Sequence, residues 1–482
     1  MILAAALCTA FAATFSRPLE RVSSMDPAKC QSVYDAHAVQ LVYETPLAVD
    51  YKARPYRLAP GYCELPEVGE GGLRYVFRIR GNPSVPGGRR CAEDMVRSLG
   101  RLREPACPNG WIVKDVASAK ALDPGTVEVR LVRRVRYFPW LMTIGSCAVS
   151  APDGDGTGPY RLARWRKNPE MEFIRRTPVE GGFDAVRYLV VDDMSTQWLM
   201  FLRGEVDMLG NLSRDACDSV IGSDGRLVPG LAKKGIRLHS IPTLEVMYVG
   251  INMRDPLLGR NKKLRQALNC AFDFPAWAEF HGHRVEECSG PVPPGVAERL
   301  ETPFPYRYDI EKAKALLADA GYPGGTDPAT GRRLVLTMAI GRPDQASRES
   351  GELIASFYGR IGVKMELDYM TWDAFLTAVN ESRVQLYRMG WVGDYPDAQN
   401  FLQLFYGPNR SPGVNHSSYE NAEFDAAYER EDYAKCQEIV REDCPWIFVN
   451  CGRSYSLVGP RVGNYVPSDF PYGNERHFTV AR

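Results

Sequence analysis

Short runs of alternating apolar and polar residues predict several half-buried β-strands. Residues 73–80 read LRYVFRIR, so every second side chain is apolar and most of the others are arginine. Residues 127–131 (VEVRL) and 363–369 (VKMELDY) alternate in the same way. Because successive side chains of a strand point to opposite faces of its sheet, each run indicates a strand with one face on a core and one in water.

Apolar residues spaced three and four positions apart predict helices. The segment 309–325 reads DIEKAKALLADAGYPGG and begins and ends with helix signals. Asp309 can cap the free N–H groups of the first turn, and Gly321 can take the left-handed conformation after the last one. The same spacing predicts further helices over 264–272, 353–361 and, as one long helix, 424–440.

The order of these segments and the chain length bound the fold. Strands and helices are interspersed, which indicates a mixed α/β architecture with more than one sheet. The chain has 482 residues, more than one hydrophobic core normally serves, so two or three domains are expected. Lys plus Arg and Asp plus Glu both number 59. A neutral chain has no electrostatic reason to bind nucleic acid or an anionic membrane surface.

The N-terminal residues favour export. An apolar run precedes Arg17, the first charged residue, and it is too short for a membrane span of about 20 residues. We therefore expect residues 1–16 to be a signal segment and the protein to be periplasmic or in the cell envelope. Ala10-Phe11-Ala12 resembles a cleavage site. Lipid anchoring at Cys8 is a weaker alternative.

The 12 cysteines fit an exported protein. Removal of Cys8 with the signal leaves an odd number, and export permits disulfides whose pairing the sequence leaves open. No CxxC pair is present, so neither a zinc ribbon nor a thioredoxin-like site is predicted. Cys270 and Cys436 fall within helical patterns and are expected to be small buried residues.

The sequence templates of common enzymes are missing. There is no GxSxG, P-loop, GxGxxG or HExxH motif, so we expect no catalytic residue, no cofactor and no metal site. His281-Gly282-His283 could offer two metal ligands, and residues 153–156 (DGDG) faintly resemble a calcium loop. Neither has the further ligands that a site needs, so a polar loop and a tight turn are expected instead.

Residues 389–402, MGWVGDYPDAQNFL, are the strongest candidate for a binding site. Asp394 stands between Trp391 and Tyr395, and a carboxylate beside an aromatic wall suits an ammonium group through a charge-assisted hydrogen bond and a cation–π contact. Glycine, as at Gly393, lets the backbone turn sharply beside bulky groups. The alternative is an ordinary aspartate-rich turn over a core tryptophan, and the residues alone leave both open.

Motifs in the right order along the chain resemble the family 5 solute-binding proteins of ABC importers, the oligopeptide- and dipeptide-binding group. The segments that carry the resemblance are residues 25–27 and 41–47 (MDP and LVYETPL), 75–80 and 92–96 (YVFRIR and AEDMV), 156–160 (GTGPY), 202–207 (LRGEVD), 264–268 (LRQAL), 309–325 and 390–397 (GWVGDYPD). The resemblance therefore covers most of the chain.

The resemblance implies an α/β, two-lobed clam-shell of the periplasmic-binding-protein type (type II, three-domain, cluster C-like). In such a fold the ligand is enclosed as the lobes close. The first lobe would hold a discontinuous domain I (17–47, 150–245 and 454–482) and a small domain II (48–149). Domain III (246–453) would be the second lobe.

The resemblance also implies ligand contacts. In peptide-binding members the aspartate of the GW..D motif takes the ligand's ammonium group, and Asp394 stands at that position, three residues after Trp391. Arg342-Pro343 resembles an Arg-Pro whose arginine pairs with the ligand carboxylate in dipeptide-binding members, and a guanidinium fork fits a carboxylate. The expected ligand-binding residues are Asp394, Trp391, Arg342, Tyr395 and Gly393.

The expected function is therefore a monomeric, non-enzymatic solute-binding protein outside the cytoplasm. It would capture short peptides and deliver them to the permease and ATPase subunits of an ABC importer. The same fold could instead hold a metal chelate, haem, a glutathione-like ligand or a sugar. For a chelate or haem the candidate contacts are His281, His283 and His416. A hydrolase and a receptor without a transport role are the remaining alternatives.

Overall fold

The computed structural model describes residues 13–19, 22–30, 32–81, 90–105, 107–166, 170–191, 193–210, 212, 217, 219–222, 225–468, 470 and 472–481. The chain divides into two compact units. Unit 1 is Met1–Ile241 with Ser454–Arg482, and unit 2 is Pro242–Arg453. The finer division into the predicted domains I, II and III stays a prediction.

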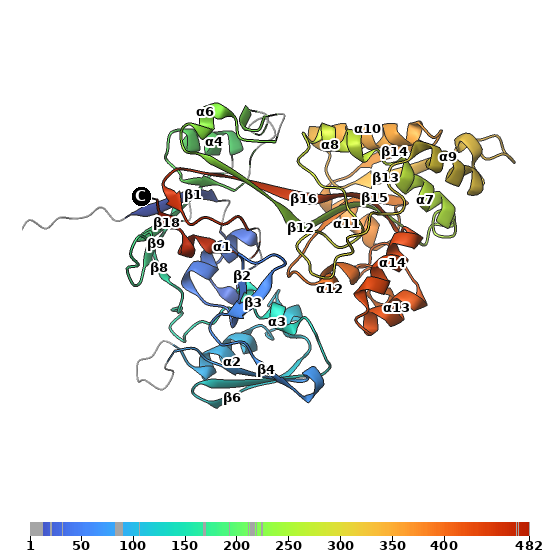
Figure 1. Ribbon diagram of the computed structural model, residues 1–482. Coiled ribbons are helices and arrows are strands. Elements are labelled where there is room, and N and C mark those ends of the chain that lie inside the picture. Colours follow the sequence, from blue (N-terminus) through green and yellow to red (C-terminus); the bar gives the residue numbers. More distant parts are fainter. Residues whose placement is uncertain are drawn as a thin grey trace, which may run out of the picture. The chain divides into compact units, whose positions relative to one another are not determined.

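The larger sheet of unit 1 has the strand order β1-β10-β9-β8 (Figure 1). β1 pairs in parallel with β10, and the other pairs are antiparallel. Buried side chains of the sheet, such as Phe173 and Tyr188, join those of helix α1 in one core cluster. The bounds are β1 (Thr14–Leu19), β8 (Tyr160–Arg166), β9 (Glu170–Arg175), β10 (Ala185–Val190) and α1 (Val33–Val42).

Strand β1 differs from the predicted end of the signal segment. Residues 14–16, which the sequence pattern placed in the segment 1–16, are the first residues of β1, and Phe15 is fully buried. This part of the apolar run is therefore explained by core packing. Residues 1–12, with Cys8 and the cleavage-like motif, lie outside the described residues, so the signal segment stays a prediction.

The smaller sheet of unit 1 confirms two strands expected from alternation. Its order is β4-β5-β7-β6, and all its pairs are antiparallel. Phe77 and Val127 are fully buried, and helix α2 contacts β6 and β7. The bounds are β4 (Glu67–Gly69), β5 (Arg74–Arg78), β6 (Val116–Asp123), β7 (Thr126–Leu131) and α2 (Ala92–Arg101).

Unit 1 also holds the predicted tight turn at 153–156. Gly154 has a φ of +83°, and the Asp153 carboxylate accepts the Asp155 N–H at 3.0 Å. The remaining helices and strands described in this unit are β2 (Leu47–Asp50), β3 (Arg57–Pro60), α3 (Phe138–Leu141), α4 (Met194–Leu202), β11 (Met208–Leu209), α6 (Pro229–Ala232), β17 (Val462–Gly463) and β18 (Thr479–Val480).

Unit 2 is built on a sheet in which β16, β12, β15, β13 and β14 are neighbours in that order (Figure 1). β12 and β15 are antiparallel, whereas β13 runs parallel to both β14 and β15. β14 confirms the strand expected over 363–369. The bounds are β12 (Arg237–Ile251), β13 (Val335–Ile340), β14 (Lys364–Tyr369), β15 (Leu386–Val392) and β16 (Trp446–Val458).

One hydrophobic cluster joins these strands to helices α7 to α10. The helix signals at 309–325 are confirmed: the Asp309 carboxylate accepts the Lys312 N–H at 3.0 Å, and Gly321 has a φ of +95°. Cys270 is fully buried, as expected. The bounds are α7 (Lys262–Ala271), α8 (Phe274–Phe280), α9 (Ile310–Asp319), α10 (Gln345–Gly359), α11 (Trp372–Asn380) and α12 (Ala398–Leu402).

The single long helix predicted over 424–440 is wrong, because the chain forms two helices there. They are α13 (Ala422–Glu429) and α14 (Tyr433–Asp443). Between them Glu431 has a φ of +60°, which a helix does not allow, and the Asp432 carboxylate accepts the Lys435 N–H at 3.1 Å as the N-cap of α14. The apolar spacing continues across the break because both helices bury one face.

Candidate ligand-binding site

The predicted binding stretch is a strand, a loop and a helix of unit 2. Strand β15 ends at Val392, residues 393–397 form the loop, and α12 follows. Asp397 caps α12, since its carboxylate accepts the Gln399 N–H at 2.9 Å, and it is buried. The two aspartates of the loop therefore differ in role: Asp397 starts the helix, and Asp394 is left for other contacts.

Asn400 of α12 holds the loop together, a role that no local sequence pattern indicates. Its Oδ1 accepts the Trp391 indole N–H at 2.8 Å and the Asp394 backbone N–H at 3.3 Å. The Asn400 Nδ2 group is buried and has no hydrogen-bond partner among the described residues. One side chain thus positions both the predicted aromatic wall and the predicted carboxylate, and keeps a donor unused.

The Asp394 side chain is open to solvent although protein surrounds its carboxyl group. Desolvation by these surroundings raises the pKa of Asp394, and the Asn400 side chain opposes the rise. The side chain is nevertheless exposed, so a ligand can reach the carboxyl group. A carboxylate that is partly desolvated and still accessible suits a cationic ligand group.

Gly393 and Tyr395 have packing roles in the structure. A Cβ on Gly393 would lie 2.7 Å from Phe401 Cζ, and Gly393 is not among the residues with positive φ. Close packing, and not the expected sharp turn, therefore requires glycine here. Tyr395 is buried and donates from its hydroxyl to Gln399 Oε1 at 2.6 Å. Both residues shape the loop that carries Asp394.

Arg342 follows β13, the parallel neighbour of β15. It is exposed and forms no hydrogen bond or ion pair with any described residue. Because β13 and β15 are parallel, Arg342 and Asp394 both follow the carboxyl ends of adjacent strands. The structure therefore places a free cation and an accessible carboxylate beyond the same edge of one sheet.

The strand register gives the separation of these two charges along the sheet. Ile340 lies opposite Arg388. Arg342 follows Ile340 by two residues and Asp394 follows Arg388 by six, a difference of four residues. If both chains continued at the strand rise of about 3.3 Å per residue, this offset would be about 13 Å in the strand direction, which an extended peptide of roughly three or four residues would span.

Arg388 on β15 is a second candidate cation that the sequence reading missed. Its guanidinium donates to Ser350 Oγ at 2.6 Å and lies 5.6 Å from the centroid of the Trp277 ring, but it forms no ion pair with any described residue. Burial lowers the pKa of Arg388, and Asp344 and Tyr369 oppose this. Arginine stays charged in proteins, so Arg388 is a half-buried cation without a carboxylate in direct contact.

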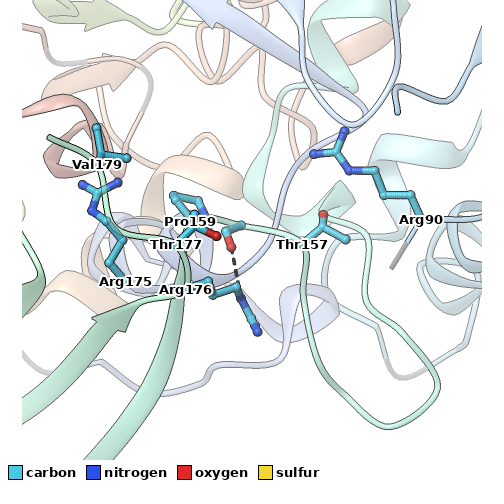
Figure 2. Close-up of a pocket in the computed structure, with 8 residues that line it drawn as sticks. Arg90, Thr157, Pro159, Arg175, Arg176, Thr177 and Val179 are labelled. Carbon is cyan, nitrogen blue, oxygen red and sulfur yellow. Dashed lines mark hydrogen bonds between the residues drawn. The ribbon is translucent and has the colours of Figure 1, made fainter. Parts of the chain in front are cut away.

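A cavity of about 570 Å³ lies in unit 1, and none of these residues lines it (Figure 2). Three arginines line it, and each of them already makes polar contacts within the protein. Arg90 pairs with Glu44, and Arg176 pairs with Asp155 and donates to the Gly158 carbonyl at 3.1 Å. Arg175 donates to the Phe183 carbonyl at 2.7 Å. The fold explains these arginines without a ligand.

The candidate metal ligands are not brought together. Among the described residues, no group of three or more His, Cys, Asp or Glu is placed to hold a metal ion. His281 and His283 follow α8, where the His281 ring lies 4.4 Å from the Trp277 ring. Burial lowers the pKa of His416. None of the helices in the described ranges is long and apolar enough to cross a membrane.

A family model gives the identity of the chain. The model described as "Bacterial extracellular solute-binding proteins, family 5 Middle" matches residues 57–413. The chain belongs to this family. The match to family 5 runs through parts of both units, and it confirms the membership expected from the ordered motifs.

Two curated relatives and one solved structure show the range of the family. This family 5 chain is 26% identical to heme-binding protein A of Haemophilus influenzae, over 88% of this chain and 84% of the relative. It is 23% identical to the dipeptide-binding protein of Escherichia coli, over 90% and 88%. The structure of HbpA2 from Haemophilus parasuis, 21% identical, superposes with a TM-score of 0.85 over 97% of this chain and 100% of that chain. That likeness confirms the predicted α/β two-lobed fold.

Proposed function

We propose that this family 5 protein captures short peptides outside the cytoplasm and delivers them to the permease and ATPase subunits of an ABC importer. The observation that carries the peptide part is the pair of opposite charges beyond one edge of the unit 2 sheet. Asp394 is an accessible carboxylate, and Arg342 is a cation without an ion pair that follows the adjacent parallel strand. A peptide with free ends carries the complementary pair of charges.

In this proposal the peptide ammonium group binds the Asp394 carboxylate. Trp391, which Asn400 holds in place, supplies an aromatic wall for a cation–π contact. The unused Asn400 Nδ2 donor suits a backbone carbonyl of the ligand. Gly393 and Tyr395 act through the shape of the loop. These contacts use only the termini and backbone of a peptide, so many side chains would be accepted.

The peptide carboxylate binds one or both of the two unpaired arginines. Arg342 lies beyond the sheet edge and suits a peptide of roughly three or four residues, by the offset of about 13 Å. Arg388 is half-buried, and an anion would supply the counter-ion that it lacks. The protein changes no bond in the ligand, which is released as it was bound.

A second candidate ligand is haem, because heme-binding protein A is 26% identical to this chain. His281, His283 and His416 are the side chains that would contact the iron. Titration of the purified protein with haem, followed by absorbance in the Soret region, discriminates between the two. A shifted band at one equivalent that His416→Ala removes would favour haem, whereas unbound haem together with peptide binding favours the peptide proposal.

The direct test is isothermal titration calorimetry with one tripeptide in a free and an N-acetylated form. Asp394→Ala should weaken binding of the free peptide by more than tenfold, because a hydrogen bond to a charged group contributes about 1.5–3 kcal/mol. Acetylation should weaken binding to the unaltered protein by a similar factor and add little in the variant. Asp319→Ala, an exposed carboxylate of α9 in the same unit, is the matched control.

The ammonium role is disproved if Asp394→Ala binds the free peptide as tightly as the unaltered protein does. Native mass spectrometry of the protein as purified should come first, because a retained cellular ligand reveals its class by mass. A retained peptide supports the proposal, and a retained sugar or chelate contradicts it.

A further inference from the structure

Two buried cysteines of unit 2 lie with their sulfur atoms in direct contact. The Sγ atoms of Cys288 and Cys451 are 2.8 Å apart, although 163 positions separate the residues in the chain. The two residues are 4% and 0% exposed. The buried cysteines Cys436 and Cys444 behave differently, since their thiols donate to the backbone carbonyls of Phe424 and Arg441.

The backbone brings the two sulfurs together without their help. Cys451 is part of β16, and Glu286 pairs with it in an antiparallel bridge. The Glu286 N–H donates to the Cys451 carbonyl at 3.1 Å, and the Cys451 N–H donates to the Glu286 carbonyl at 2.8 Å. Arg453 forms an ion pair with Glu286. Cys288 follows two residues later, so the contact is fixed by the fold.

The segment between α8 and α9, residues 281–309, contains no helix or strand. It is held on unit 2 by separate contacts: Arg441 donates to the Thr302 hydroxyl at 2.8 Å, and the Phe304 ring lies 4.9 Å from the Phe448 ring. A covalent anchor would stabilise such a long irregular segment. The stabilisation is largest when a cross-link joins residues far apart in the chain, because it then restricts the unfolded state most.

We propose that Cys288 and Cys451 form a disulfide when the chain folds in an oxidising compartment, and that this bond anchors the segment 281–309 to β16. The inference rests on the proposed location outside the cytoplasm, where disulfides persist. The sulfurs need to approach by about 0.8 Å, since a disulfide bond is about 2.04 Å long. Cys451 lies two residues before Arg453, the last residue of unit 2.

The oxidant is a disulfide, either of an exchange protein or of a small thiol such as glutathione. One cysteine loses its proton and attacks this disulfide, which forms a mixed disulfide and releases one thiol. The second cysteine, also deprotonated, then attacks the mixed disulfide and releases the other. Two protons and two electrons pass from the cysteines to the oxidant, which ends as two thiols.

Burial explains when the bond forms and why it persists. Burial and the adjacent Cys451 sulfur raise the pKa of the Cys288 thiol, so the folded protein holds little of the reactive thiolate. The bond therefore forms while the chain is folding. In the folded state both sulfurs are shielded, since Cys288 and Cys451 are 4% and 0% exposed, and the cavity beside Cys288 has a volume of only about 20 Å³.

The test is peptide mapping without reduction. Protein made in cells from the full chain is treated with an alkylating agent in denaturant, digested, and analysed before and after reduction. We expect one linked pair of peptides that contains Cys288 and Cys451, lighter by two hydrogen atoms than the sum of its parts. In parallel, the chain is refolded from the reduced state in a mixture of oxidised and reduced glutathione.

The two preparations test the disulfide pairing and the location outside the cytoplasm separately. The linked peptides in both support the proposal. A link that forms on refolding but is missing from the protein made in cells supports the pairing and contradicts the location outside the cytoplasm. Full alkylation of both cysteines in both preparations overturns the proposal, as does a link from either cysteine to a third one.

Thermal unfolding gives a second readout that does not need a variant to fold. The oxidised protein should unfold roughly 5 to 15 °C higher than the same protein refolded with reductant. Cys436→Ala, a buried cysteine without a sulfur partner, should keep this difference. Cys288→Ala and Cys451→Ala should abolish it, and the double variant should resemble each single one. An identical midpoint with and without reductant in the unaltered protein would contradict the anchor.

Discussion

At the scale of single residues, the charged groups of the candidate site differ in their exposure to solvent and in their contacts with the protein. Asp394 has its backbone N–H fixed by Asn400, while its carboxylate is open to solvent. Arg342 and Arg388 form no ion pair with described residues. An exposed cation such as Arg342 is stable in water on its own, whereas a half-buried one such as Arg388 is not well solvated. The two arginines should therefore respond differently to substitution.

Arg388→Gln should weaken binding of a tripeptide more than Arg342→Gln does. The reason is that a charge pair in a desolvated site contributes more than one in water. We expect a loss of tenfold or more for Arg388→Gln and a smaller loss for Arg342→Gln, measured by calorimetry. Amidation of the peptide carboxylate should weaken binding as much as substitution of the arginine that contacts it. In the variant of that arginine, amidation should weaken binding no further. Equal affinity of acid and amide for the unaltered protein would rule out both contacts.

The sequence identified the residues of this site unevenly, for a physical reason. Asp394 and Trp391 stood out because a charge beside aromatic groups is visible in the residues themselves. Arg388 could have been noticed as the one charge in the run 384–392, but its lack of a counter-ion depends on distant elements. Asn400 acts across a loop on two residues of other elements, and no local pattern reveals such a contact.

At the scale of elements, helix signals were reliable where they came from both ends. The helix over 310–319 had a capping residue and a terminating glycine, and both act as expected. The residues 424–440 had only apolar spacing, which two successive helices on one core satisfy as well as one long helix does. The break depends on the positive φ of Glu431 and on the N-cap Asp432. In the sequence, neither residue differs from the other polar residues of the segment.

Asp432→Ala tests this break. The variant loses the N-cap of α14 and should unfold about 0.5–2 kcal/mol more easily. Asp432→Ser should retain most of the stability, because serine also accepts the hydrogen bond of a helix N-terminus. Urea unfolding followed by circular dichroism measures both. If the region were one continuous helix, alanine would be the better residue and the first variant would be more stable.

At the scale of the whole molecule, the family assignment rests on order rather than on any one motif. The motifs lie in both compact units, and the fold agreement with HbpA2 extends over 97% of this chain. Ligand choice is not set at this scale, since relatives named for haem and for dipeptides match the chain at 26% and 23% identity. The fold fixes where charges are presented, and in our proposal a few residues beyond the carboxyl ends of β13 and β15 decide what is bound.

Residues from the first and last parts of the described chain meet inside unit 1 in a buried ionic cluster of Arg17, His37 and Glu475, here called the chain-end cluster. Arg17 Nη1 donates to Glu475 Oε1 at 2.7 Å, and His37 Nδ1 lies 3.5 Å from the same oxygen. Glu475 is 1% exposed. Burial raises the pKa of Glu475, but the hydrogen bonds and charges of His37 and Arg17 outweigh it and hold that pKa well below its usual range.

This cluster makes the stability of unit 1 depend on pH in a defined direction. Because the pKa of Glu475 is lower in the folded state than the value of about 4.3 in an unfolded chain, the unfolded state takes up a proton first as the pH falls. The stabilisation is complete above about pH 4.3 and is lost as the pH falls below it.

Glu475→Gln should therefore cost about 3–5 kcal/mol near neutral pH, where it leaves the Arg17 charge buried without a partner. Unfolding by urea from pH 7 to pH 3 should show the gap between this variant and the unaltered protein narrowing below about pH 4.3. Glu104→Gln, which alters an exposed carboxylate of the same unit, should leave the dependence of the unfolding free energy on pH unchanged. If the difference between Glu475→Gln and the unaltered protein stays constant over the whole pH range, the charge of Glu475 does not stabilise the chain-end cluster.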